Sequence, residues 1–280
     1  MAPILKAIIF DVDGTLAETE EEHRRAFNAA FRAFGLPWQW NTKTYRELLA
    51  IGGGRERLET FFKEKHLKID KHLIFDLHKE KSRIYTARIA TGCLRARPGV
   101  LRLIAEARAA GIYLACATPS QRSNVVTLLR SLLGEVRAET IFTVLGCGED
   151  VSHKKPAPDI YLWVLKQLGL QAESCVVIED TSVGLVSATK AGLPTIITLS
   201  TYSENINNTQ NMFSDAIAVL DHLGELYQPF TILAGQTYGH GSHKVVDISL
   251  LRQWLACYRQ GSQIAAITEQ DRSISGKESL

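Results

Sequence analysis

The sequence predicts an α/β fold: a doubly wound parallel-sheet (Rossmann-like) core with an inserted all-helical cap. Three observations predict it. The apolar run Ala7-Ile8-Ile9-Phe10 has the length and composition of a buried parallel strand and ends in aspartates. Residues 18–91 then show helix-like patterns without a convincing strand. From about residue 97, helical and strand-like segments alternate, as in a parallel sheet covered by helices on both faces.

The helical block interrupts one domain, because the first strand belongs to the same sheet as the later alternating segments. We expect a catalytic core at 1–17 and 92–225, a cap at 18–91, and a partly disordered C-terminal extension at 226–280. Core helices are expected at 100–110, 124–133, 158–168 and 183–191, and strands at 112–117, 141–145, 175–178, 195–199 and 216–220. In the extension, residues 249–258 predict an amphipathic helix, and the polar tail beyond residue 261 predicts disorder.

Two carboxylates follow the first strand, where open α/β sheets place their sites. Asp11 and Asp13 stand one residue apart before a Gly-Thr turn. Like charges held this close need a cation, a shared proton or a metal-bound phosphate beside them. One carboxylate can attack phosphorus while the other moves the proton. The alternative is an Asp-rich turn without chemistry, because Asp and Gly are common turn residues.

The segment at 20–34 predicts the first cap helix, with Thr19 as its N-cap and Gly35 as its end. Its apolar stripe consists of Ala26, Phe27, Ala30, Phe31 and Phe34. An aromatic helical region follows, and the glycines at 52–54 interrupt it before helix-like patterns resume at 56–90. The cap is therefore expected to contain helices alone.

Three further strand ends carry polar groups suited to phosphate chemistry. Thr118 has a hydroxyl that can donate to a phosphate oxygen, although it can also cap a helix. Lys155 precedes two prolines that stiffen its loop, and it is either a charge-neutralising lysine or one of a solvated pair. Glu179 and Asp180 end another apolar strand as hard oxygen ligands of the kind Mg²⁺ prefers, unless Asp180 only caps the next helix.

Composition excludes several other classes of protein. With 45% hydrophobic and 22% charged residues, the chain is an ordinary globular one. A net charge of +2 favours no binding to nucleic acid, and no apolar stretch approaches the length of a membrane span. The five cysteines form no Cys-x-x-Cys pair, so a reducing compartment fits best. The first residues lead straight into the strand, so we expect no signal or transit peptide.

The four motifs, taken in order over residues 4–225, resemble those of the haloacid dehalogenase-like hydrolases. The resemblance implies that Asp11 is the nucleophile and Asp13 the acid and base, because the dehalogenases of that family lack the second aspartate. It implies that Thr118 and Lys155 hold the phosphoryl oxygens. The implied Mg²⁺ ligands are Asp11, the Asp13 carbonyl and Asp180, with help from Glu179.

The cap motifs at 18–28, 45–49 and 53–57, together with Lys155-Pro156-Ala157-Pro158-Asp159-Ile160-Tyr161, resemble those of CbbY-type phosphatases. Members of that group hydrolyse xylulose 1,5-bisphosphate, an inhibitor of Rubisco. Glycine amides and a guanidinium can form an anion site for the second phosphate, although an ordinary glycine turn has the same pattern. Arg55 stands where the group has lysine, and Pro119-Ser120-Gln121 replaces a Thr/Ser-rich run. The resemblance implies that the substrate contacts are Glu20, His23, Gly53, Gly54, Arg55, Arg57, Ser120 and Asn124.

These features predict a Mg²⁺-dependent sugar-phosphate phosphatase that converts xylulose 1,5-bisphosphate to xylulose 5-phosphate through an aspartyl phosphate. Two alternatives remain: a phosphomutase of the β-phosphoglucomutase kind, and a non-catalytic regulator that binds a phosphorylated ligand. The expected partner is a small sugar phosphate, with a functional link to Rubisco that implies no direct contact, and with neither nucleic acid nor membrane. We expect the protein in a bacterial or cyanobacterial cytoplasm, or in the plastid stroma if it is plastid-encoded.

Overall fold

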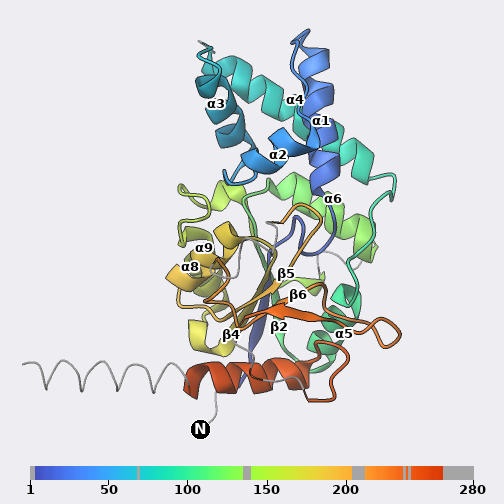
Figure 1. Cartoon of the computed structure of the whole chain (residues 1–280), viewed down its shortest axis with the longest axis vertical. Coiled ribbons are helices and arrows are strands. Elements are labelled where there is room, and N and C mark those ends of the chain that lie inside the picture. The colour runs from blue at the N-terminus through green and yellow to red at the C-terminus, as the bar shows by residue number, and fades with distance from the viewer. Residues whose placement is uncertain are drawn as a thin grey trace, which may run out of the picture.

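A computed structural model describes residues 4–67, 70–134, 140–203, 212–235, 238 and 241–260. A helical cap stands over one end of a sheet-based core (Figure 1). The cap helices are α1 (Glu20–Ala33), α2 (Thr42–Leu48), α3 (Gly54–Glu64) and α4 (Lys71–Ile89). The strands are β1 (Ala7–Phe10), β2 (Tyr113–Ala117), β3 (Val144–Gly146), β4 (Cys175–Glu179), β5 (Thr195–Thr198), β6 (Ala218–Leu220) and β7 (Ile232–Ala234).

The described strands form one sheet in the order β3-β2-β1-β4-β5-β6-β7, parallel except for β7. Helices α5 (Val100–Ala109) and α6 (Arg122–Leu133) cover one face, and α8 (Asp159–Leu168) and α9 (Ser182–Lys190) cover the other (Figure 1). In β1, Ile8 and Phe10 pack with the first face and Ala7 and Ile9 with the second. This alternation follows from the two-residue period of a strand, and it buries β1 on both sides. The predicted fold class is confirmed.

The strand order places β1 between β2 and β4, at the point where the order reverses. Phe10 lies opposite Cys116 of β2 and Ile178 of β4. The residues that follow these three strands therefore meet at one edge of the sheet, beneath the cap. Ligands of doubly wound sheets bind in this position.

The cap has a core of its own, in which Phe27, Phe31, Trp40 and Tyr45 are almost fully buried. The rings of Phe27 and Trp40 lie 4.7 Å apart, and those of Phe31 and Trp40 lie 5.0 Å apart. Aromatic pairs in such arrangements hold α1 against the segment that leads into α2. Phe34, which is predicted to lie on the buried stripe, is 38% exposed.

The structure differs from the sequence prediction in two elements beyond the cap. Strand β3 begins at Val144 rather than 141, because residues 140–141 are helical. Beyond residue 225, β7 pairs antiparallel with β6, and a helix at 248–260 packs Trp254 and Leu255 into the main apolar cluster. That helix agrees with the predicted one, whereas three-residue β7 is too short to show a period. The tail predicted to be disordered lies outside the described residues.

In the part of the chain that the structure describes, every helix is too short or too polar to cross a bilayer.

Candidate active site

Lys155 connects the ends of three strands through a single ammonium group. Its Nζ donates to Asp11 Oδ1 at 2.7 Å, to Glu179 Oε1 at 2.5 Å and to the Ala117 carbonyl at 2.8 Å. Burial alone would lower the pKa of Lys155, but the two carboxylates raise it above its usual range. The lysine therefore stays charged and neutralises part of the carboxylate cluster.

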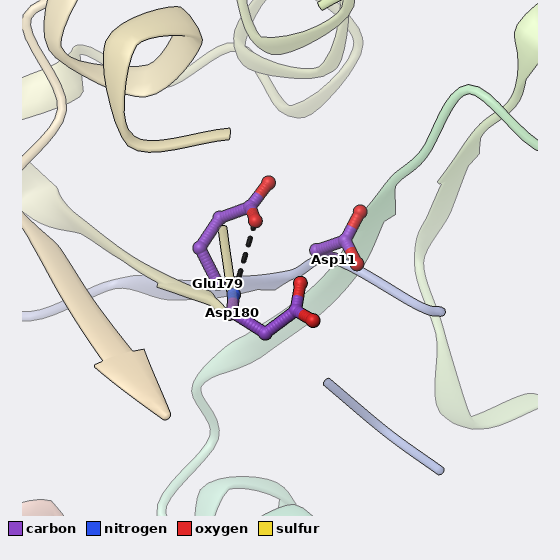
Figure 2. Close-up of side chains that lie close together, drawn as sticks. All are labelled: Asp11, Glu179 and Asp180. Carbon is purple, nitrogen blue, oxygen red and sulfur yellow. Dashed lines mark hydrogen bonds between the residues drawn. The ribbon is translucent and has the colours of Figure 1, made fainter. Parts of the chain in front are cut away.

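Asp11, Glu179 and Asp180 form a buried cluster whose ligand atoms lie within 4.8 Å of one another (Figure 2). Both carboxylate oxygens of Glu179 already accept hydrogen bonds within the protein. Lys155 and Tyr161 donate to its Oε1, and the Asp180 N–H donates to its Oε2 at 3.1 Å. Within the described residues, Asp11 and Asp180 each keep one carboxylate oxygen that accepts no hydrogen bond. Those two oxygens remain available to a ligand.

Burial, together with the neighbouring carboxylates, raises the pKa of both Asp11 and Asp180 well above the ordinary value. This cluster thus carries more negative charge than Lys155 neutralises. Hard oxygen donors with unsatisfied charge fit a divalent cation of the Mg²⁺ type. Asp11 and Asp180 would hold it, while Glu179 would orient Lys155 and the backbone of Asp180.

Gly14→Ala is expected to disrupt this cluster. Gly14 has φ +84°, and a Cβ there would lie 2.1 Å from Asp180 Oδ2. The left-handed backbone itself costs an alanine about 1–2 kcal/mol of stability. Displacement of Asp180 should in addition weaken Mn²⁺ binding by about tenfold or more, measured by electron paramagnetic resonance.

Gly35→Ala is the matched control, because Gly35 has φ +66° and no neighbouring heavy atom within 4 Å of its would-be Cβ. Both variants should lose stability in thermal melts, Gly14→Ala the more because its Cβ displaces Asp180, while only Gly14→Ala should bind Mn²⁺ more weakly. Equal Mn²⁺ affinity in the two variants would show that glycine is needed at position 14 only for its left-handed backbone, and not to leave space for Asp180.

Asp13 accepts hydrogen bonds from three side chains. Thr19 Oγ1 donates to Asp13 Oδ1 at 2.6 Å, His23 Nε2 lies 2.9 Å from the same oxygen, and Ser120 donates to Oδ2. Burial would raise the pKa of Asp13, but His23 and these donors hold it below its usual range. Thr19 occupies the N-cap position of α1, as predicted, but its hydroxyl binds Asp13 instead of capping a helix N–H.

His23 in turn contacts Lys81 of the cap, whose Nζ lies 2.8 Å from His23 Nδ1. An ammonium can only donate, so His23 accepts at Nδ1 and carries its proton on Nε2, toward Asp13. Burial, reinforced by Lys81, lowers the pKa of His23, which agrees with this neutral form. Burial also lowers the pKa of Lys81 to about 8. The ring of His23 stacks on Tyr85 at 3.8 Å, so α1 and α4 jointly fix its orientation.

The cap and the core enclose a cleft, with Asp11 and Asp13 at its floor. On the cap side it is lined by Gly53, Gly54 and Arg55, at the start of α3. Gly53 precedes the helix with φ +102° and has no side chain to cap the first N–H groups of α3, and the Glu56 carboxylate lies beside it. Such a helix start attracts anions, and the exposed guanidinium of Arg55 adds a full positive charge.

Arg57 also lines the cleft, but its guanidinium is already engaged. It donates to the carbonyls of Leu48 at 3.0 Å and Ile51 at 3.2 Å, and to the Tyr45 hydroxyl at 3.0 Å. Arg57 is 9% exposed. These contacts favour a role in bracing the chain between α2 and α3 over the phosphate contact expected from the sequence.

Of the remaining predicted residues, Glu20, Ser120 and Asn124 line the same cleft, whereas Thr118 is fully buried and does not line it. Tyr45 donates to Glu20 at 2.6 Å, which orients that carboxylate along the wall. Ser120 N–H donates to Thr118 Oγ1 at 3.1 Å, so the Thr118 hydroxyl proton stays available to a ligand. Asn124 is 4% exposed, and its Oδ1 has no hydrogen-bond partner among the described residues. Such a buried acceptor is suited to a ligand hydroxyl.

Sequence reasoning missed His78, Lys81, Tyr202 and Ser200 as parts of this site. Ser200 Oγ donates to Asp180 Oδ2 at 2.7 Å. The sequence could have identified Ser200, because it follows the end of a strand, as the residues of the other motifs do. His78 and Lys81 lie on the buried face of α4 near Leu77, and polar residues at apolar helix positions were the available signal for them. Tyr202 had no local signal.

Comparison with known proteins agrees with this geometry. The family model for haloacid dehalogenase-like hydrolases matches residues 8–198. Protein CbbY of Cupriavidus necator is 41% identical over 256 residues, covering 89% of this chain and 96% of that protein. A crystal structure of CbbY from Rhodobacter sphaeroides in complex with phosphate is 42% identical, with a TM-score of 0.73, over 80% of this chain and 98% of the other.

A second crystal structure from Rhodobacter sphaeroides contains mutant CbbY in complex with xylulose-(1,5)bisphosphate. It is 41% identical, with a TM-score of 0.72, and covers 80% of this chain and 98% of that one. The similarity to CbbY proteins expected from the cap motifs is thus confirmed. The family match over most of the core, together with these relatives, shows that this chain belongs to the haloacid dehalogenase-like hydrolases.

Proposed function

We propose that this protein is a Mg²⁺-dependent sugar-phosphate phosphatase that hydrolyses xylulose 1,5-bisphosphate to xylulose 5-phosphate. The observation that carries the proposal is a cleft with a nucleophile at one end and an anion site at the other. Asp11 lies at its floor, and Arg55 with the start of α3 lies across the cleft on the cap. A sugar with one phosphate at each end matches such a cleft, and a CbbY relative binds this compound.

In the proposed reaction, the Asp11 carboxylate attacks phosphorus and forms an aspartyl phosphate. The bond from phosphorus to the sugar oxygen breaks, and that oxygen takes from Asp13 the proton that Asp13 received from water in the preceding turnover. Water then attacks the same phosphorus and gives its proton to Asp13, which releases phosphate and restores Asp11. Lys155 and Thr118 bind phosphoryl oxygens throughout. A bound Mg²⁺, held by Asp11, Asp180 and the Asp13 carbonyl, would supply positive charge beside these oxygens.

The surroundings of Asp13 favour the second half of this reaction. Its three donors keep it ionised, and the ionised form is the one that accepts a proton from water. Two of those donors, Thr19 and His23, come from the segment that leads into the cap and from its first helix. We propose that residues 18–91 act as a lid over the core, so that Asp13 is fully held only when the lid is closed.

Arg55→Ala is the test of the bisphosphate. It should lower kcat/KM for xylulose 1,5-bisphosphate by roughly 10- to 100-fold, because one charge-assisted contact is worth about 1.5–3 kcal/mol. Activity on a small aryl phosphate should barely change, since that substrate reaches only Asp11. Phosphate release measures kcat/KM for each substrate, and the ratio of the two kcat/KM values is compared between wild type and variant. Lys63→Ala on the same helix lies outside the cleft and should change neither value.

An unchanged ratio in Arg55→Ala would remove the anion site from the proposal. The products also separate hydrolysis from transfer: free phosphate and xylulose 5-phosphate support the phosphatase, and an isomeric sugar phosphate supports a mutase.

The proposed link to Rubisco is metabolic, through removal of an inhibitor, and needs no contact between the proteins. The proposed location follows Rubisco: the bacterial or cyanobacterial cytoplasm, or the plastid stroma for a plastid-encoded chain.

A further inference from the structure

The loop after β5, residues 199–203, holds Asp180 by two hydroxyl groups. Ser200 Oγ donates to Asp180 Oδ2 at 2.7 Å, and Ser203 Oγ donates to the Asp180 carbonyl at 2.6 Å. The Ser200 N–H donates back to Ser203 Oγ at 2.8 Å, so the two serines form one turn. This β5 loop therefore sets the orientation of the Asp180 carboxylate.

The same loop is attached to the cap through Tyr202. Tyr202 is only 7% exposed and belongs to the apolar cluster of the cap, although the chain places it in the core. Its hydroxyl donates to Glu21 of α1 at 2.5 Å, and its ring lies edge-on to Tyr45 of α2 at 5.8 Å. Arg46 lies 5.5 Å above the ring and donates to the Thr201 carbonyl at 3.1 Å.

We propose that Tyr202 is a positioning residue for Asp180: it fastens the β5 loop to the closed cap, and the fastened loop holds the carboxylate for the divalent cation. The proposal rests on the proposed function only in taking Asp180 as a cation ligand. A cap that swings away must pull the Tyr202 ring out of its cluster, which loosens the turn of Ser200 and Ser203.

Cap closure and cation binding are then thermodynamically coupled, because each favours the same arrangement of the loop. Such coupling is reciprocal: a bound cation also favours the closed cap. The consequence is that the protein assembles its complete cation site only when the cleft is covered, which keeps the reactive phosphoryl group away from bulk water.

The test is Mn²⁺ affinity without substrate, measured by electron paramagnetic resonance on the full chain. Tyr202→Ala should raise the dissociation constant about tenfold, in the range known for residues that orient metal ligands. Ser200→Ala should have a similar effect. The double variant should be less than additive, because both residues act through one loop. In turnover assays, added Mg²⁺ should restore much of the activity of Tyr202→Ala, which a general structural defect would not allow.

Phe62→Ala is the matched control, because Phe62 is an aromatic of the same cap cluster with ring contacts to Trp38 and Phe61. It should leave Mn²⁺ affinity within about twofold. If Tyr202→Ala does not fold, Tyr202→Phe keeps the ring, loses the bond to Glu21, and should weaken Mn²⁺ binding about threefold. Wild-type affinity in a folded Tyr202 variant overturns the coupling, whereas a wild-type protein that binds no Mn²⁺ overturns the cation site itself.

Discussion

Asp11→Asn is expected to abolish phosphate release while leaving the protein folded. The amide is nearly isosteric with the carboxylate but cannot attack phosphorus, so kcat should fall on the order of 10⁴- to 10⁶-fold. Lys155 keeps Glu179 and the Ala117 carbonyl as acceptors, so it is not left as an unpaired buried charge. Steady-state turnover of the purified variant measures the loss, and Asp215→Asn, exposed and outside the cleft, serves as the control.

The same variant should be at least as stable as the wild type when metal is removed by a chelator. The pKa of Asp11 is higher in the folded protein than its ordinary value, so the ionised form is less favourable there. Above that raised pKa, the carboxyl group therefore lowers the free energy of unfolding, and the asparagine removes this loss. Thermal melts at neutral pH test the sign. Appreciable steady-state phosphate release by Asp11→Asn would instead refute the aspartyl-phosphate mechanism.

Asp13→Asn is expected to lower kcat on the order of 10²- to 10⁴-fold, the usual contribution of a positioned acid and base. Mn²⁺ binding should persist, because we assign the metal contact of this residue to its backbone carbonyl. Comparing kcat with Mn²⁺ affinity in the same preparation separates the two roles. A variant that loses both in proportion would show that the side chain acts on the cation.

Asp13→Asn should also lose stability at neutral pH, in contrast to Asp11→Asn. The pKa of Asp13 is lowered in the folded protein, so its carboxylate contributes stability above the ordinary pKa and loses it as the pH falls. The difference between wild type and variant in thermal melts should therefore shrink in acid. A difference that is constant with pH would contradict the assignment of Asp13 as a stabilised carboxylate.

Local pattern is sufficient to predict the layered fold and the candidate catalytic floor. A two-residue period identifies a strand buried on both faces, and parallel strands bring their carboxyl ends to one edge. These two rules alone predict that Asp11, Thr118 and Asp180 gather at the same edge of the sheet, whereas Lys155 reaches it from a loop nine residues beyond the end of β3. Helical periodicity likewise separates the cap from the core, because the cap contains no segment with the period of a strand.

What the sequence by itself determined was thus the fold class and the edge where polar side chains gather. Only the tertiary structure decided which partner each polar side chain takes. Lys155 binds Asp11 across 144 residues, and Tyr202 binds Glu21 across 181. The Thr19 hydroxyl donates to Asp13 rather than capping its own helix. The physical reason is that backbone periodicity depends on neighbours in the chain, whereas a hydroxyl, guanidinium or carboxylate takes the partner that folding brings within about 3 Å.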